Sequence, residues 1–259
     1  MIPKVIHYCW FGRNPLPELA LECIDSWKRF FPEYTIIQWN EDNFDVNIIP
    51  YTREAYHAKK YAFVSDYARF WILNKYGGLY FDTDVEVVKS FDKIVDAGPF
   101  LGFEQPTEYG KSILKLEKIF TADGFGVNPG LGLGGTAGLP FFKSILDKYS
   151  QLHFINKDGS YNQTTIVKYT TDLLVLQGLQ LDNSRQVIAG MQVYPWDYFC
   201  PQSCYTKQVH LSDNTVSIHL YAASWYSKGQ KIAMYISKFI GKKMLHKIAT
   251  LLKRLNIIK

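Results

Sequence analysis

The chain has 259 residues and a net charge of +5 at pH 7, and 47% of its residues are hydrophobic and 16% aromatic. This composition excludes a disordered or low-complexity chain, and the length suffices for one α/β domain with a buried core and a short extension. No segment approaches the roughly 18 consecutive apolar residues of a membrane span, and the first residues lack the basic-then-apolar pattern of a secretory signal, so we expect a cytoplasmic protein.

Strand and helix patterns alternate through the first hundred residues. Residues 4–12 combine β-branched and aromatic side chains, which is typical of a buried strand, here ending at Gly12. Residues 18–31 place apolar side chains at spacings of three and four before Pro32, which predicts a helix. A second strand pattern follows at residues 34–40. This alternation predicts an α/β domain with a largely parallel sheet, in which ligands bind at the carboxyl ends of strands.

The segment at residues 53–76 contains no glycine or proline and ends at two glycines, which predicts a helix or a helix pair with a glycine stop. Its second half carries apolar side chains on nearly all sides, so it should be largely buried. Asp66 and Arg69 lie three residues apart within it. Because buried charges need partners, we expect these two residues to pair with each other, with a neighbour or with a ligand.

An Asp-Thr-Asp sequence lies in the β-rich segment at residues 79–88. On or just past a strand, the period of two turns Asp82 and Asp84 to one face while Thr83 points away. Two carboxylates at this distance repel each other unless a cation lies between them. Mg²⁺ and Mn²⁺ accept such oxygen ligands, often together with substrate phosphates. We therefore predict a divalent-metal site, although the tripeptide alone also occurs as solvated acids in surface turns.

Residues 121–140 are rich in glycine, and residues 130–135 match the GxGxxG fingerprint of dinucleotide binding. The context excludes dinucleotide binding, because that fingerprint should follow a first strand and open a helix. Here an Asn-Pro pair precedes residues 130–135, and Gly138 interrupts the segment that follows them. We favour a flexible loop near a substrate. Beyond it, helical patterns occupy residues 141–180 and short strand patterns residues 187–226.

The end of the chain is strongly basic. Residues 228–259 hold nine Lys or Arg and no acid, and subtracting these nine from +5 leaves −4 for the rest. Apolar side chains share one helical stripe with lysines largely opposite, which is typical of an interfacial helix on an anionic membrane. The alternative is a terminal helix packed on the domain with a solvated basic face. We expect a domain at residues 1–226 and a basic amphipathic helical extension at residues 227–259.

Two neighbouring motifs point to a known family. SDYAR at residues 65–69 and YGGLYFDTD at residues 76–84 fit the pattern SDxxR through GGxYxDxD, which resembles the signature of the DXD sugar transferases in glycosyltransferase family 32. IPKVIHYCWFG at residues 2–12 and SIHLYAASW at residues 217–225 agree with it, so the resemblance covers most of residues 1–226. The group is similar to outer-chain-initiating mannosyltransferases, bacterial capsule and lipooligosaccharide transferases, and the catalytic domain of the large clostridial glucosylating toxins.

The resemblance implies a GT-A type fold, a Rossmann-like mixed sheet flanked by helices that binds a nucleotide sugar. It implies that Asp66 and Arg69 contact donor-sugar hydroxyls and phosphate and that Tyr80 lies near the donor. Asp82 and Asp84 would face the ribose and the metal, which is Mn²⁺ or Mg²⁺.

Four further roles follow from the same resemblance. His219 is the candidate third metal ligand, and Ser224 and Trp225 would close over the diphosphate. Trp10 would border the nucleotide base, although a core tryptophan is an equally good interpretation. Asn128 would contact the donor sugar, although its position before a proline also suits an ordinary turn.

The chain departs from the family pattern at two places. Leu220 stands where many members carry a second His, and residues 170–172 read Thr-Thr-Asp where a Thr-Gly-Pro motif is usual. Both departures leave the acceptor side and the full metal shell open.

The resemblance implies a retaining glycosyltransferase that uses a nucleotide-diphosphate sugar, with UDP-sugars favoured over GDP-sugars. We expect a saccharide or lipid-linked acceptor in bacterial capsular, exopolysaccharide or lipopolysaccharide synthesis, at the inner face of the cell membrane through residues 228–259. A metal-dependent nucleotide-sugar hydrolase or phosphotransferase is an alternative. Another is a non-enzymatic binding module; nucleic acid is not an expected partner, because the regular apolar stripe of the tail lacks the aromatic platforms of single-strand binders.

Overall fold

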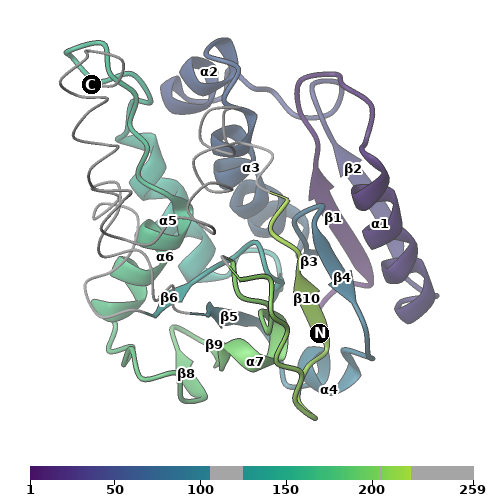
Figure 1. Cartoon of the computed structure of the whole chain (residues 1–259). Coiled ribbons are helices and arrows are strands. Elements are labelled where there is room, and N and C mark those ends of the chain that lie inside the picture. Colours follow the sequence, from purple (N-terminus) through teal and green to yellow (C-terminus); the bar gives the residue numbers. More distant parts are fainter. Residues whose placement is uncertain (106–124, 205, 223–259) are drawn as a thin grey trace, which may run out of the picture.

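The computed structural model describes residues 1–105, 125–204 and 206–222, which form a mixed β-sheet with helices on both faces (Figure 1). The predicted α/β fold class is therefore confirmed. The predicted extension at residues 227–259 lies outside the described residues. The elements in chain order are β1 Val5–Cys9, α1 Glu18–Phe30, β2 Thr35–Trp39, α2 Pro50–His57, α3 Tyr61–Tyr76, β3 Gly78–Tyr80, β4 Val85–Val87, α4 Asp92–Asp96, β5 Phe100–Glu104, β6 Gly126–Val127, β7 Leu133–Gly135, α5 Pro140–Ser150, α6 Ile166–Val175, β8 Gln186–Ile188, β9 Met191–Tyr194, α7 Trp196–Phe199 and β10 Ser217–His219.

The main sheet has the strand order β2-β1-β3-β7-β5-β9-β8, with β6 paired to β5. β1 is parallel to β2 and β3, and β5 is parallel to β9, whereas β7 is antiparallel to both β3 and β5. An antiparallel strand between two others makes those two run in the same direction. Strands β2, β1, β3, β5 and β9 therefore all end at one edge of the sheet, as predicted for a largely parallel sheet.

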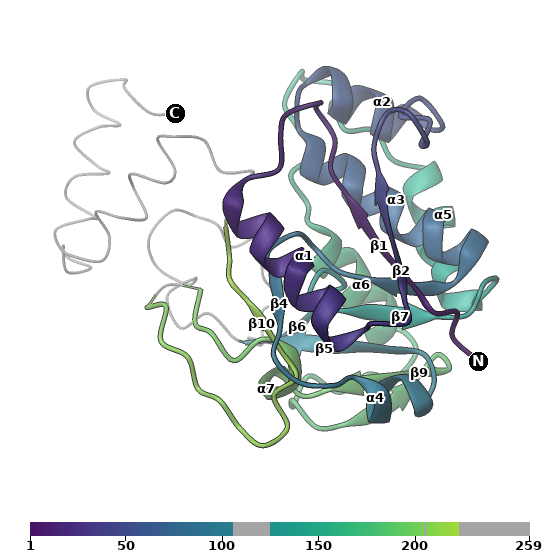
Figure 2. The same cartoon turned by 90° about the vertical axis from the view of Figure 1, so that its right-hand side faces the viewer.

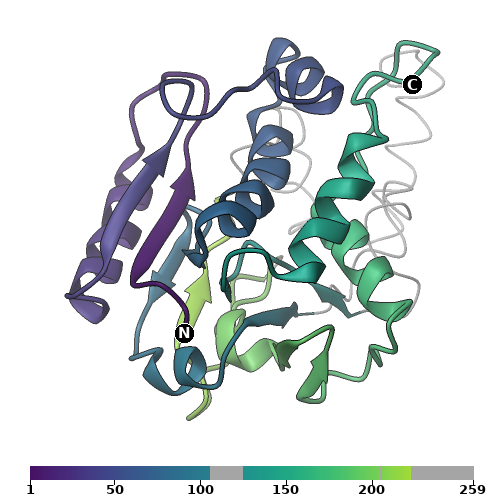
Figure 3. The same cartoon turned by 180° about the vertical axis from the view of Figure 1, so that it is seen from behind.

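Two apolar clusters fill the two faces of the sheet. One contains buried side chains of α3 and α5, including Val64, Phe70 and Phe142, and the other contains Trp27 of α1 and Phe81. Figure 3 shows α3 and α5 on the side of the sheet opposite α1, and Figure 2 shows α1 beside the small sheet of β4 and β10. Of the helices within the described ranges, none combines the length and apolar character needed to cross a bilayer.

The ends of α1 and α3 lie close to where the sequence predicts them. α1 stops just before Pro32, and the predicted helix pair is α2 and α3, although α2 begins at Pro50. α3 ends at Gly77, whose φ of 65° is unfavourable for other residues and whose N–H donates to the Leu73 carbonyl. This stop directs the chain into β3 at the centre of the sheet.

The predicted strand at residues 79–88 is wrong as one continuous element. β3 pairs within the main sheet, whereas β4 pairs with β10 in a separate two-stranded sheet. Between them, Asp82 N–H donates to the Gly130 carbonyl and Val85 N–H donates to the Asp82 carbonyl, which closes a turn. The two acids therefore lie just past β3, where the chain passes from one sheet to the other.

The flexible loop predicted over residues 130–135 is wrong for its second half. Residues 133–135 form β7, a buried strand between β3 and β5. A Cβ at Gly134 would lie 2.3 Å from Phe100, and a Cβ at Gly135 would lie 2.6 Å from Phe142. These glycines therefore let large aromatic side chains pack directly against the strand, and the segment opens no helix of the dinucleotide-binding kind.

His7 of β1 is a buried, uncharged link between three elements. Its Nδ1 accepts a hydrogen bond from Trp39 Nε1 at 3.1 Å, and its Nε2 donates to the Gly77 carbonyl at 3.0 Å. Burial lowers the pKa of His7 from 6.5 to about 4. The His7 imidazole takes up a proton near pH 6.5 in the unfolded chain but only near pH 4 in the folded chain. The contribution of His7 to folding stability is therefore fully present above pH 6.5 and is lost as the pH falls towards 4.

We expect the stability difference between the unaltered chain and His7→Gln to shrink by about 3 kcal/mol between pH 7 and pH 4. Urea unfolding of both proteins across this range measures the difference and cancels the titration of all other groups. Parallel stability curves for the two proteins would contradict a neutral, buried His7.

Candidate functional site

Several predicted site residues meet at the carboxyl edge of the main sheet. β1, β3 and β5 run in the same direction, so Trp10, Asp82 and Glu104 at their ends lie along this edge. β7 runs the other way, so the loop before it, which begins near Asn128, reaches the same edge. This is the edge at which α/β sheets bind ligands.

Arg69 on α3 is the centre of a buried charge cluster. Its Nη2 lies 2.8 Å from Asp66 Oδ1 and 3.2 Å from Asp82 Oδ1. The Tyr80 hydroxyl donates to Asp82 Oδ1 at 3.0 Å, and the guanidinium lies 4.9 Å from the centroid of the Tyr80 ring. The pairing expected for Asp66 and Arg69 is thus confirmed. Because the Arg69 side chain is 4% exposed and that of Asp82 is 31% exposed, Asp82 is the member that a ligand can reach.

Burial and mutual charge set the protonation of this cluster. Burial raises the pKa of Asp66 to about 7, although the adjacent Arg69 charge opposes this shift. Burial lowers the pKa of Arg69, but the combined effect of Asp82, Tyr80 and Asp66 is larger and opposite, so the pKa is raised overall. Arg69 therefore remains a fixed cation that holds the Asp82 carboxylate in position.

Asp84 faces a different set of partners from Asp82. Its Oδ1 lies 3.2 Å from His219 Nε2, and its Oδ2 accepts the Ala222 N–H at 2.8 Å. Burial raises the pKa of Asp84, but the His219 charge and hydrogen bond outweigh burial and lower it to about 2. The pKa of His219 rises well above 6.5, because Asp84 outweighs the effect of burial. The pairing of β10 with β4 thus brings residue 219 beside the Asp-Thr-Asp turn.

The predicted metal ligands fit a divalent cation in part. When two neighbouring ligands each lie about 2.1 Å from an octahedral metal ion, the two ligand atoms are about 3 Å apart. Asp84 Oδ1 and His219 Nε2 are separated by a similar distance, 3.2 Å. Asp82 instead turns to Arg69 and Tyr80. In the part of the chain that the structure describes, no three His, Cys, Asp or Glu side chains are grouped to hold a metal. Asp84 and His219 are therefore close enough together to share an ion once His219 loses its proton, and Asp82 as a ligand stays a prediction.

The Asn128–Gly130 turn lies directly against Asp82. Asn128 Oδ1 accepts the Gly130 N–H at 2.8 Å, and the Gly130 carbonyl accepts the Asp82 N–H at 3.0 Å. A Cβ at Gly130 would lie 1.9 Å from Asp82 Oδ2. Asn128 thus shapes the turn, and Gly130 leaves the space that the Asp82 carboxylate occupies. The predicted contact of Asn128 with a donor sugar stays a prediction.

Trp10 lies at the end of β1, beside the end of β2. Its N–H donates to the Trp39 carbonyl at 2.8 Å, and its Nε1 donates to the Asn14 carbonyl at 2.7 Å. The side chain is half-buried and packs against the apolar cluster of α1. The role of Trp10 beside a nucleotide base stays a prediction, and Ser224 and Trp225 lie outside the described residues.

Glu104, a buried acid at the end of β5, is a site residue that no sequence motif predicts. An acid that closes the apolar run PFLGF is the only local signal of its position. Its relation to Asp82 depends on the strand order, which the sequence does not display. Glu104 therefore enters the site only through the fold.

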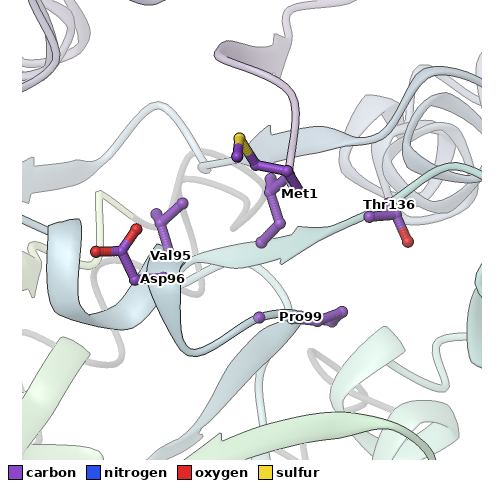
Figure 4. Close-up of a pocket in the computed structure, with 7 residues that line it drawn as sticks. Met1, Val95, Asp96, Pro99 and Thr136 are labelled. Atoms are coloured by element: carbon purple, nitrogen blue, oxygen red, sulfur yellow. The ribbon is translucent and has the colours of Figure 1, made fainter.

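A cavity of about 340 Å³ lies at the opposite edge of the sheet (Figure 4). Met1 precedes β1, Asp96 and Pro99 precede β5, and Thr136 follows β7, so its lining belongs to the amino ends of the parallel strands. This cavity is therefore separate from the cluster around Asp82.

Comparisons with known proteins identify a family that matches the region around the Asp-Thr-Asp turn, together with several relatives. Residues 17–101 match a family described as the glycosyltransferase sugar-binding region containing a DXD motif. Mannosyl phosphorylinositol ceramide synthase CSH1 of Saccharomyces cerevisiae is 29% identical over 122 residues, which cover 44% of this chain and 31% of that protein. Inositol phosphoceramide mannosyltransferase 3 of Schizosaccharomyces pombe is 26% identical over 121 residues, or 45% of this chain and 34% of that protein. The matched segments thus span about a third of these relatives.

Similar solved structures include PaToxG glycosyltransferase, with a TM-score of 0.48 and 18% identity over 68% of this chain and 70% of that one. The galactosyltransferase LgtC has a TM-score of 0.45 and 14% identity over 95% of both chains. The family match at residues 17–101 contains Asp66, Arg69, Asp82 and Asp84. This region of the chain therefore matches the family of glycosyltransferases whose sugar-binding region contains a DXD motif, in agreement with the resemblance seen in the sequence.

Proposed function

We propose that this protein is a retaining, metal-dependent glycosyltransferase that moves a sugar from a nucleotide-diphosphate sugar, with UDP-sugars favoured, onto a saccharide acceptor. One observation carries the proposal. The partly exposed carboxylate of Asp82 is fixed by buried Arg69, next to the Asp84–His219 pair, at the ligand-binding edge of the sheet.

This arrangement suits the chemistry of a nucleotide-sugar donor. The nucleoside diphosphate that leaves gains negative charge as the glycosidic bond breaks. Asp84 and His219 would hold Mn²⁺ or Mg²⁺, which supplies Lewis-acid stabilisation of that charge. Asp82, held by Arg69 and Tyr80, would offer its partly exposed carboxylate to ribose or sugar hydroxyls.

The proposed stereochemical route is substitution on one face of the sugar, in which the departing phosphate helps to deprotonate the acceptor. The family resemblance supports retention of the anomeric configuration. A covalent sugar–protein adduct trapped in the unaltered chain would contradict this route, because double displacement requires a protein carboxylate as nucleophile.

The proposed acceptor is a saccharide, in particular a lipid-linked glycan at the inner face of the cell membrane. The basic amphipathic pattern of residues 228–259 supports membrane binding. The names of two relatives refer to phosphoinositol ceramides, which supports a lipid-linked acceptor. The same names refer to mannosyl transfer, so mannosyl donors belong among the candidates beside UDP-sugars. Bacterial capsular, exopolysaccharide or lipopolysaccharide synthesis is the setting we propose.

Thermal unfolding with a panel of UDP- and GDP-sugars, with and without Mn²⁺, tests the proposal. A donor at about 100 times its dissociation constant adds about 2.7 kcal/mol, which raises the melting temperature by roughly 5–10 °C for a chain of this size. We expect one donor to give this shift only with Mn²⁺, and Asp84→Asn to abolish it.

Asp25→Asn, on the exposed face of α1, is the matched control, because it makes the same change at a solvent-exposed carboxylate whose ion-pair partner is Lys28. It should keep the full shift. An unaltered chain that responds to no donor with any metal would overturn the proposed function, and an equal shift in Asp84→Asn would overturn the metal role.

A further inference from the structure

Glu104 is a buried carboxylate to which none of the roles above is assigned. It is the last residue of β5, lies opposite Gly126 of β6, and is 9% exposed. Because β7 is antiparallel to both β3 and β5, Glu104 ends its strand at the same edge at which Asp82 follows β3. The fold therefore adds a further acid to the site.

The neighbours of Glu104 all belong to this site. The side chains of Tyr221 and Asn128 lie near enough to act on its carboxylate, as do the charges of Asp82 and His219, and the rings of Tyr221 and His219 lie 4.2 Å apart. The backbone fixes the approach of Asn128, whose N–H donates to the Gly102 carbonyl at 3.0 Å. Burial raises the pKa of Glu104, with His219, Tyr221 and Asn128 opposing the rise.

The charges around Glu104 restrict what it can bind. Asp82 lies nearby, so an anionic phosphate placed here would meet two carboxylates and be repelled. In the described residues, Glu104 joins no group of three metal-binding side chains. A buried carboxylate at a ligand edge is best satisfied by neutral O–H donors, which sugars supply in abundance.

We propose that Glu104 binds and orients a sugar hydroxyl of the substrate, a role that rests on the proposed transferase function. The hydroxyl belongs either to the donor sugar or to the acceptor, and both sources share this chemistry. Glu104 is thus a determinant of sugar specificity. A site built to hydrogen-bond a hydroxyl discriminates strongly against an analogue that lacks it.

The test compares the unaltered chain, Glu104→Gln and the control Glu22→Gln, an equal change on the exposed side of α1. Each protein is assayed with the nucleotide sugar and acceptor that the unaltered chain uses, and with singly deoxygenated versions of both. We expect Glu104→Gln to lower kcat/KM by roughly 10- to 100-fold, the cost of a lost hydrogen bond to a charged group. Its affinity for UDP alone and its melting temperature should match those of Glu22→Gln.

One deoxy sugar should remove the difference between the proteins, because analogue and variant lose the same hydrogen bond. A deoxy donor with this effect assigns the contact to the donor sugar, and a deoxy acceptor assigns it to the acceptor. If the losses in kcat/KM from Glu104→Gln and from each deoxy sugar simply add, or if Glu104→Gln leaves kcat/KM unchanged, the role of Glu104 is overturned. The proposed transferase function would not be affected by either result. An unaltered chain that transfers no sugar would overturn both.

Discussion

Replacing Arg69 by methionine should lower the free energy of unfolding by about 3–5 kcal/mol and abolish sugar transfer. The side chains of Asp66 and Arg69 are 12% and 4% exposed, so the variant leaves a buried carboxylate without its cation. Asp82 loses the guanidinium at 3.2 Å that holds it. Urea unfolding measures the first effect, and turnover of the nucleotide sugar measures the second.

Two controls separate stability from chemistry. Asp66→Leu combined with Arg69→Met should recover much of the stability, since replacing a whole buried pair costs less than breaking it, but it should not recover transfer. Lys143→Met breaks the exposed pair with Asp147, whose side chains are 68% and 60% exposed, and should change neither quantity measurably. A loss below about 1 kcal/mol in Arg69→Met would contradict the buried cluster.

The sequence was sufficient to predict that Asp66 and Arg69 are buried and need partners, because the signals for this are local. A segment without glycine or proline and with apolar side chains all round predicts a buried helix, and charges inside it must be paired. The structure agrees for the pair of Asp66 and Arg69, and it adds the contact of Arg69 with Asp82 just past the next strand. Helix, glycine stop and central strand follow from the order of residues alone.

The separation of the two acids could not be predicted from the Asp-Thr-Asp sequence. Alternation along a strand turns Asp82 and Asp84 to one face, but the chain leaves the main sheet between β3 and β4. Asp82 then pairs with Arg69, and Asp84 with His219, which lies 135 residues farther along the chain. Tertiary partners thus outweigh strand periodicity, because a nearby opposite charge decides where a carboxylate turns.

The position of Glu104 depends on a strand that the sequence analysis interpreted as a loop. β7 contains two glycines and no β-branched residue, so its composition does not predict a strand. Its insertion between β3 and β5 gives those strands one direction and brings Glu104 to the edge that carries Asp82. A residue pattern in one segment cannot show this, because the strand order is a property of the whole sheet.

Replacing Gly130 by alanine should lower transfer by roughly 100-fold while the chain stays folded. The new Cβ would lie 1.9 Å from Asp82 Oδ2 and 2.8 Å from Asp82 Cγ, so the carboxylate must move away from Arg69 and Tyr80. The backbone itself accepts alanine, because the φ of Gly130 lies outside the left-handed region. A displacement of about 1 Å in a positioned group is enough for a loss of this size.

Gly159→Ala gives the opposite result and serves as the control. Its Cβ meets nothing within 4 Å, but its φ of +80° is unfavourable for alanine, so this variant should lose stability and keep full activity. Circular dichroism and urea unfolding establish that Gly130→Ala is folded, and kcat with the nucleotide sugar measures its defect. Full activity in a folded Gly130→Ala would contradict the requirement for Asp82 at its observed position, because the added methyl group and that position exclude each other.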